Sequence, residues 1–346
     1  TPEPPPAPAP PPPPSAEDNL KSYDEGFASI FVGGRIDVAK IDQYVVPTVV
    51  VHDQPEGQQD LAGWKATIAN INNAFSEIKA TKLGAWAQGD LVGAHLQFDM
   101  RSTGEFNGIK STGEMVSVRG IEIMRYDQGK IAERWATFDR HGLMQQLGAA
   151  PGKPVITPGE SERRDAAPDP VANQKLIEGF LTSKAFSGTT PEERSAALSG
   201  VIAEDALFHG LDPKSQGLSG FTSRVEDVMT ATAEQQPSTV AVLADGDMVI
   251  AHWENSMVHS GELMGRKPTG MRLTARGTDL YRIAEGKIVE GWQYMDTAGL
   301  VAQLDALTEE AKKPVAEEPA AAAPAAPAAP EPAKPAAEAA QPPAAE

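Results

Sequence analysis

Two stretches of the sequence decide the fold: RGIEIMRYDQGKIAERWATFDRHGLMQQL at 119–147 and RGTDLYRIAEGKIVEGWQYMDTAGLVAQL at 276–304. Thirteen of the 29 positions are identical without a gap. At the same offset, residues 41–147 align with 198–304 throughout. The chain therefore predicts a tandem duplication of one structural unit.

Each unit begins with a helical pattern and ends with a strand pattern. In the first copy, apolar residues recur at helical spacing over 20–31 and 61–78. Runs typical of strands follow, and Gly129 marks a tight turn between the last two of them. The strand-like runs are 46–52, 81–87, 90–101, 115–126 and 131–138. Helices followed by a meander of strands predict an α+β fold.

Proline divides the chain into compact and extended parts. Of the 30 prolines, ten lie in 1–14, nine in 314–343 and five in 151–170. The end segments contain almost no large apolar groups, so we expect them to be extended and disordered. The expected parts are a Pro-rich tail (1–16), a first domain (17–148), a linker (149–168), a second domain (169–308) and an Ala/Pro-rich tail (309–346).

The net charge of −18 disfavours nucleic acid as a partner, because a nucleic-acid surface must be basic. The sequence has no cysteine, which excludes disulfides and thiolate chemistry, and no apolar run long enough to span a bilayer. The chain starts at Thr1 within a proline tract. We interpret this as an exported form held in the bacterial periplasm or cell envelope by a lipid or other tether, or secreted; the alternative is a cytoplasmic protein.

Several short motifs occur in both copies, among them G-D-x-V, G-E-x-x-G, R-x-x-x-G-K-I-x-E-x-W and D-x-x-G-L-x-x-Q-L. Together they resemble the SnoaL-like branch of the nuclear transport factor 2 superfamily. The resemblance implies two cone-shaped domains, each with N-terminal helices packed in a strongly bent, mainly antiparallel sheet around an apolar pocket. Members include polyketide cyclases, isomerases, dehydratases and binding modules without catalysis, and these domains commonly dimerise through the outer sheet face.

Alternation along the strands sorts the repeated residues between the pocket and the outer face. In the cyclases that the chain resembles, an acid/base aspartate lies three positions before the D-x-x-G aspartate. Here that position holds Ala136 and Gln293, and neither side chain can transfer a proton. The residues expected to line the pockets are Met124, Arg134, Ala136, Phe138, Tyr281, Gln293 and Met295.

A carboxylate and a histidine remain as candidate catalytic residues in each copy. Glu122 and Asp279 fall on the pocket face, and His52 and His209 end the first strand at a position that lines the pocket in the family. A histidine and a carboxylate facing one apolar cavity could act as an acid/base pair. Alternatively, each is a polar anchor at the pocket rim.

The opposite sheet face carries a second repeated set. We expect this set to join the two domains as an intramolecular pseudo-dimer. Its members are His95, Arg119, Glu133, Trp135, His252, Arg276, Glu290 and Trp292. The six histidines show no ligand spacing, so the sequence predicts neither a metal site nor a cofactor.

Two functions fit these patterns. The first is a module that binds an apolar small molecule or a partner protein through its pockets, without the cyclase reaction. The alternative is a cyclase, isomerase or hydrolase that acts on a polyketide- or lipid-like substrate with a pocket histidine and carboxylate.

Overall fold

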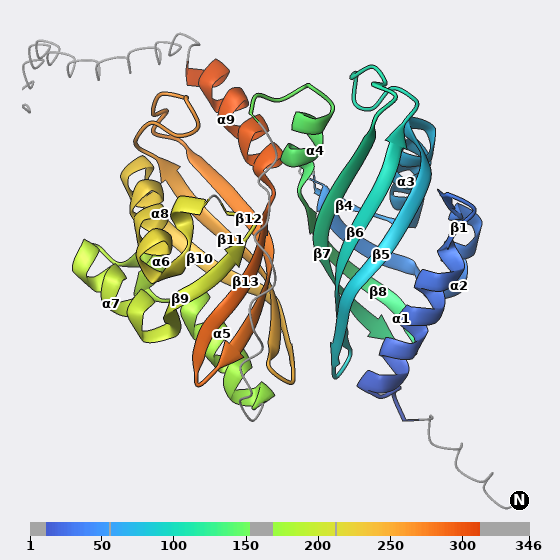
Figure 1. Ribbon diagram of the computed structural model, residues 1–346, viewed down its shortest axis with the longest axis horizontal. Helices are drawn as coiled ribbons and strands as arrows, with labels where there is room; N and C mark the ends of the chain where they lie inside the picture. Colours follow the sequence, from blue (N-terminus) through green and yellow to red (C-terminus); the bar gives the residue numbers. More distant parts are fainter. Residues whose placement is uncertain (1–11, 55–56, 153–168, 212, 312–346) are drawn as a thin grey trace, which may run out of the picture.

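The computed structural model describes residues 12–54, 57–152, 169–211 and 213–311 (Figure 1). Residues 1–11 and 312–346 of the expected tails, and 153–168 of the expected linker, lie outside the described residues. The α+β fold predicted from the sequence is confirmed: two domains each combine helices with one mixed, curved sheet.

Domain 1 runs from its first helix to the short helix after the last strand. Its elements are α1 (Ala16–Ile30), β1 (Phe31–Val32), β2 (Arg35–Ile36), η1 (Val38–Lys40), α2 (Ile41–Tyr44), β3 (Val45–Gln54), β4 (Gly57–Gln59), α3 (Leu61–Ala74), β5 (Phe75–Gln88), β6 (Leu91–Ser102), β7 (Met115–Asp127), β8 (Lys130–Phe138) and α4 (Arg140–Gln146).

Domain 2 repeats this plan with more helix before its first strand. Its elements are α5 (Pro170–Leu181), α6 (Lys184–Ser187), α7 (Pro191–Val201), β9 (Ile202–His209), η2 (Pro213–Ser215), α8 (Gly217–Ala231), β10 (Thr232–Asp245), β11 (Met248–His259), β12 (Arg272–Ala284), β13 (Lys287–Met295) and α9 (Thr297–Ala311). Helix α9 continues past the domain boundary expected at 308.

The two main sheets have matching strand orders. They are β4-β3-β8-β7-β6-β5 in domain 1 and β10-β11-β12-β13-β9 in domain 2. All neighbouring strands are antiparallel except β3 with β8 and β9 with β13. The last four strands of each copy therefore form the predicted meander, and β3 or β9 lies beside the final strand of its own copy.

The helix predicted over 61–78 is too long. Helix α3 ends at Ala74, and the next four residues begin β5. A bulge lies between Ser76 and Lys79, where Glu77 has a φ of 52°. The extra residue of a bulge places Phe75 and Ile78 on the same buried side, and their separation of three residues imitates helical spacing.

Two repeated local signals form as their residues predict. Gly129 and Gly286 adopt left-handed φ values of 78° and 71° in the turns before β8 and β13. The Asp139 Oδ1 atom accepts a hydrogen bond from the Gly142 amide at 2.7 Å and so caps α4. These residues, which are identical in the two copies, therefore determine the backbone conformation and do not indicate a catalytic role.

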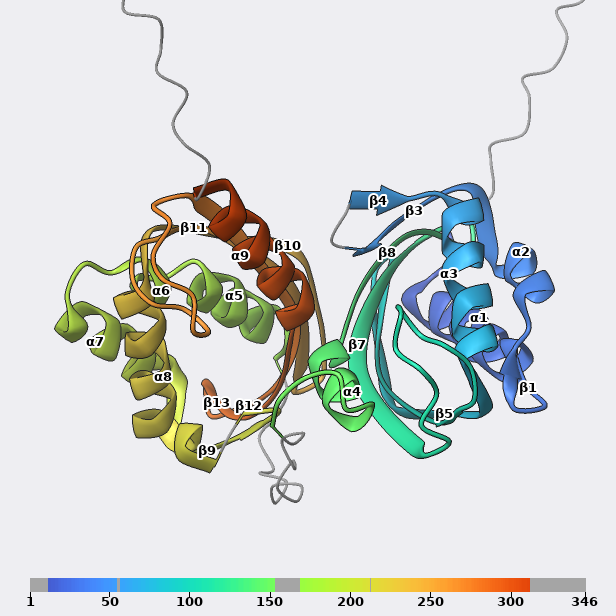
Figure 2. The ribbon, with the colours of Figure 1, turned by 90° about the horizontal axis from the view of Figure 1, so that it is seen from above.

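The domains pack together through the outer faces of their sheets, and each sheet curves around its own helices on the far side (Figure 2). One apolar cluster crosses this interface. It contains Ile121, Ile123 and Trp135 from domain 1 and Ala241, Leu243, Met248, Ile250, Leu280, Trp292 and Tyr294 from domain 2. Polar contacts border the cluster, including one between Thr137 Oγ1 and Thr278 Oγ1 at 2.9 Å.

Gly93 on β6 permits a close approach of the domains at this interface. A Cβ atom added there would lie 2.5 Å from Ile250 Cδ1 and 2.9 Å from Leu243 Cδ2. Both distances are too short for carbon atoms in contact, so a larger residue would separate the sheets or displace the Ile250 side chain. Within the described residues, no helix has both the length and the apolar character that crossing a membrane requires.

Candidate functional site: an asymmetric pair of cones

A cavity of about 720 Å³ occupies the cone of domain 2. Its size lies within the range of small-molecule sites. Apolar side chains from the helices line its interior, among them Leu181, Phe221 and Val225. Three of the residues expected to line a pocket, Tyr281, Gln293 and Met295, also border it.

Asp279 on β12 is the buried carboxylate of this cavity. Its Oδ2 atom accepts hydrogen bonds from Tyr281 Oη at 2.6 Å and from Trp253 Nε1 at 3.0 Å. Its Oδ1 atom has no hydrogen-bond partner in the part of the chain that the structure describes. The side-chain donors to this carboxyl group therefore all reach Oδ2, and the backbone of Tyr294 also acts on the group.

The surroundings of Asp279 favour its neutral form. Burial raises the pKa of this carboxyl to about 7, although the hydrogen bonds from Tyr281 and Trp253 act in the opposite direction. Burial and the adjacent carboxylate raise the pKa of Tyr281 well above its usual value, so the phenol remains a donor. Near neutral pH, Asp279 can thus either accept or donate a proton.

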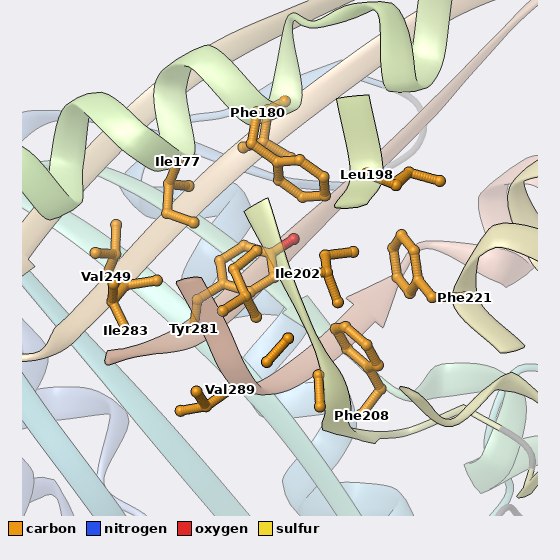
Figure 3. Close-up of a cluster of buried hydrophobic side chains, with 14 of the residues drawn as sticks. Ile177, Phe180, Leu198, Ile202, Phe208, Phe221, Val249, Tyr281, Ile283 and Val289 are labelled. Atoms are coloured by element: carbon orange, nitrogen blue, oxygen red, sulfur yellow. The ribbon is translucent and has the colours of Figure 1, made fainter. Parts of the chain in front are cut away.

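Tyr281 is held by an aromatic shell (Figure 3). The Phe180 ring meets it edge-on, with 6.2 Å between ring centroids and an interplanar angle of 88°. Gly291 lies beside it on β13, where an added Cβ would approach Phe208 Cδ1 to 3.0 Å and Tyr281 Cδ1 to 3.3 Å. The glycine therefore lets the aromatic groups pack closely and leaves the cone without a long side chain from this position.

Domain 1 has Arg134 at the position of Gly291, and this arginine lies inside the cone. Its Nη2 and Nε atoms donate to Glu122 Oε2 at 2.6 and 2.9 Å, and Tyr23 Oη donates to Glu122 Oε1 at 3.0 Å. The guanidinium lies 5.2 Å from the ring centroid of Trp64. A buried ionic network thus occupies in domain 1 the region that is open in domain 2.

Burial weakens the ionisation of both partners in this network. It lowers the pKa of Arg134 to about 10 and raises the pKa of Glu122 to about 7. The arginine therefore stays charged at neutral pH, while Glu122 lies near its midpoint.

The other pocket residues expected in domain 1 do not line the 720 Å³ cavity. Met124 is buried in the apolar core. Ala136 and Phe138 border a void of about 10 Å³ that they share with His252 and Arg276 of domain 2, and this void has the volume of a single water at most. The two cones therefore differ in what they can hold.

The structure corrects the expected positions of the two strand-end histidines. In β3, Val51 pairs with Arg134, so His52 falls on the opposite, outer face beside Trp135. His52 Nε2 lies 2.9 Å from Glu133 Oε1, and its ring stacks on Trp135 with 5.2 Å between centroids.

Domain 2 repeats this arrangement. His209 Nε2 lies 2.7 Å from Glu290 Oε1, and the His209 ring stacks on Trp292. The expected pairs of His52 with Glu122 and of His209 with Asp279 are therefore wrong. His52 and Glu122 lie on opposite faces of their sheet, and so do His209 and Asp279, because the parallel register of β3 on β8 and of β9 on β13 turns each histidine to the outer face.

The residues expected at the interface form two groups. His95, Trp135 and Trp292 lie between the domains, where His95 Nε2 is 2.9 Å from Tyr294 Oη. Burial lowers the pKa of His95 to about 3, with a further contribution from the nearby Arg119, so this imidazole is neutral. His252 is also buried, and its Nδ1 atom lies 2.8 Å from Thr278 Oγ1.

The other four interface candidates have hydrogen bonds or ion pairs with residues of their own domain. The carboxylates of Glu133 and Glu290 bind the strand-end histidines and accept from Arg125 and Arg282, respectively. Arg119 donates to Gln97, and Arg276 Nε lies 3.4 Å from Asp296 Oδ2. Within the described ranges, no three His, Asp or Glu side chains gather as a metal site requires.

Sequence reasoning missed Trp253 and the contribution of domain 1 to the cavity. Trp253 follows the buried His252 and therefore points inward, which strand parity could have indicated. His141 and Gln145 of α4 also line the cavity. No sequence signal identifies these two, because their position depends on how the domains pack.

Comparisons with known proteins match each domain separately. A sequence profile described as SnoaL-like polyketide cyclase matches residues 27–147 and 184–304, which together exceed half of the chain. A search of curated proteins found no match.

Solved structures that are similar to one domain include AclR from Streptomyces galilaeus, with 24% identity, 40% of this chain and 87% of that chain covered, and a TM-score of 0.37. TsrD from Streptomyces laurentii has 22% identity, 40% and 98% coverage, and a TM-score of 0.36. A SnoaL-like polyketide cyclase from Agrobacterium tumefaciens has 15% identity, 38% and 97% coverage, and a TM-score of 0.32.

Proposed function

The chain belongs to the SnoaL-like polyketide cyclase family, and on that premise we propose that domain 2 binds an apolar small molecule while domain 1 supports it structurally. The observation that carries this proposal is the asymmetry of the cones. Domain 2 has a cavity of about 720 Å³, whereas Arg134 and Glu122 fill the equivalent region of domain 1. Burial of apolar surface in such a cavity provides the driving force for binding.

Titration of the full chain with the neutral dye Nile red tests this proposal. Met295→Trp places a large ring in the cavity of domain 2, and Phe138→Trp changes the counterpart residue in domain 1 conservatively. We expect one dye per chain. Met295→Trp should weaken binding by roughly tenfold, about 1.4 kcal/mol, and Phe138→Trp should leave it unchanged. Equal effects of the two substitutions, or binding that neither affects, would contradict the proposal.

Acid/base catalysis is a second candidate function, favoured by the position of Asp279 in the cavity lining and by its pKa of about 7. Asp279 would abstract or deliver a proton on a bound carbonyl compound, as in an isomerase or cyclase. The test measures deuterium uptake next to the carbonyl of 2-acetylnaphthalene in D₂O. Asp279→Asn should slow the catalysed uptake by roughly 100-fold or more. Glu122→Gln, the matched change in domain 1, should not slow it.

We also propose that the protein acts outside the cytoplasm, tethered through its Pro- and Ala-rich ends. Their composition is the support, since such sequences serve as spacers. Fractionation of cells that express the native gene would place the protein in the envelope or medium, and recovery with cytoplasmic markers would contradict this location.

A further inference from the structure

The cavity of domain 2 also borders domain 1. Ser117 and Arg119 of β7, together with His141 and Gln145 of α4, contribute to its lining. These residues lie outside the cone of domain 2, because they belong to the outer face and the last helix of the other domain. The cavity thus combines an apolar part within domain 2 with a polar part supplied by domain 1.

Arg119 is the cation of this polar part. It is half-buried, and its Nε atom donates to Gln97 Oε1 at 2.7 Å. It forms no ion pair with a carboxylate anywhere in the described part of the chain. Its two Nη groups are therefore donors beside the cavity that no carboxylate of the described residues contacts at ion-pair distance.

The equivalent arginine of domain 2 differs from Arg119, because it does have a carboxylate partner. Arg276 occupies the equivalent position, and its Nε atom lies 3.4 Å from Asp296 Oδ2. Arg276 does not border the 720 Å³ cavity. The repeat has thus kept the arginine in both copies, but only the copy beside the cavity lacks a carboxylate partner.

We propose that Arg119 binds the carboxylate head of an amphipathic ligand whose apolar body occupies the cone of domain 2. This inference rests on the proposed function of that cone. A guanidinium matches a carboxylate with two parallel donors, and partial burial strengthens the contact relative to water. Arg224 of α8 lines the same cavity, where its charge acts on Asp279.

Three carboxyl groups also border the cavity, and in their ionised form they favour a cationic ligand. They are Asp139, Glu254 and the buried Asp279, whose pKa is raised to about 7. The Asp139 Oδ1 atom is already engaged as the cap of α4, by the Gly142 amide at 2.7 Å. A ligand with a cationic head is therefore the competing outcome of the test.

The experiment measures binding of dansylaminoundecanoic acid, of its methyl ester and of the corresponding dansyl alkylamine to the full chain. We expect the acid to bind roughly tenfold more tightly than the ester, as one charge-assisted contact at a half-buried site provides. Arg119→Met should reduce binding of the acid to the level of the ester and leave the ester unchanged. Arg276→Met, the matched control, should preserve the preference for the acid.

Equal binding of acid and ester to the unaltered protein would overturn the inference, and this comparison does not depend on the folding of any variant. A preference for the acid that survives Arg119→Met, or tighter binding of the amine, would also overturn it. In each of these cases, binding of the ester would still support the proposed apolar site in domain 2. If the ester does not bind and Met295→Trp has no effect on Nile red, the proposed function itself fails.

Discussion

Replacement of Arg134 by Met tests the ionic network that fills domain 1. The side chains of Arg134 and Glu122 are each 9% exposed, and two hydrogen bonds join them. Methionine fills similar space but leaves a buried carboxylate with only the Tyr23 hydroxyl as donor. Breaking a buried ion pair in this way costs about 3–5 kcal/mol of the free energy of unfolding.

The loss of stability should depend on pH, because protonation of Glu122 removes the unpaired buried charge. Its pKa is already about 7 in the folded protein, against an ordinary value of 4.5, and loss of the cation raises it further. A folded-state pKa above the unfolded value stabilises the protein most below pH 4.5, and this contribution declines as the pH rises through the folded pKa. The slope reaches at most about 1.4 kcal/mol per pH unit.

Urea denaturation of the variant at pH 5 and pH 8 measures both effects. We expect a small loss at pH 5 and close to the full loss at pH 8. The double variant Arg134→Met/Glu122→Gln should recover much of the stability at pH 8, because neither partner is then charged. The same loss at both pH values, or no recovery in the double variant, would refute the assignment of a buried ion pair to this cone.

Three further predictions concern other parts of the molecule. Asp279→Asn should flatten the dependence of the free energy of unfolding on pH between about 4 and 7. The folded carboxyl has a pKa of about 7, so its contribution to the stability of the protein declines as the pH rises through this window. Urea denaturation across that range measures the slope, and an unchanged slope would contradict the prediction. Gly93→Val should lower the free energy of unfolding by about 1–3 kcal/mol, because the new side chain would collide with Ile250. Gly89→Ala is the comparison: it lies at a turn with open space around the Cβ position, so only its φ of 59° causes strain. Asp60→Ala should cost about 1 kcal/mol by removing the cap that accepts from the Gly63 amide at 2.8 Å, as measured by thermal unfolding; a stability equal to that of the unaltered protein would show that the cap contributes nothing.

Much of the fold is predictable from the sequence because repeated residues mark backbone events. Gly129 and Gly286 identify turns by their left-handed φ, and Asp139 identifies a helix cap by its spacing to Gly142. Such signals are local, so one sequence suffices to interpret them. The bulge at Glu77 shows the limit, since it copies helical spacing within a strand.

The candidate site is less predictable from the sequence than the fold, because it depends on which face each side chain takes in its strand and on contacts between residues far apart in the chain. Strand parity placed Tyr281 and Gln293 on the cavity side, where the structure also has them. The family resemblance misplaced His52, since the parallel register of β3 on β8, which turns this side chain to the outer face, cannot be counted from the sequence. The role of Arg134 as an occupant of the cone depends on Tyr23 and Glu122, which are 99 residues apart in the chain.

Gly93 and Ile250 are counterparts in the two copies, and they face each other across the interface. In a dimer of identical subunits, a residue on the two-fold axis meets itself and must fit its own shape. Two isoleucines at this position would collide, and two glycines would leave a gap. Fusion into one chain released the copies from that constraint, and a small residue could then evolve opposite a large one. The halves have become complementary rather than identical, so neither separated copy should be able to replace its neighbour by pairing with itself.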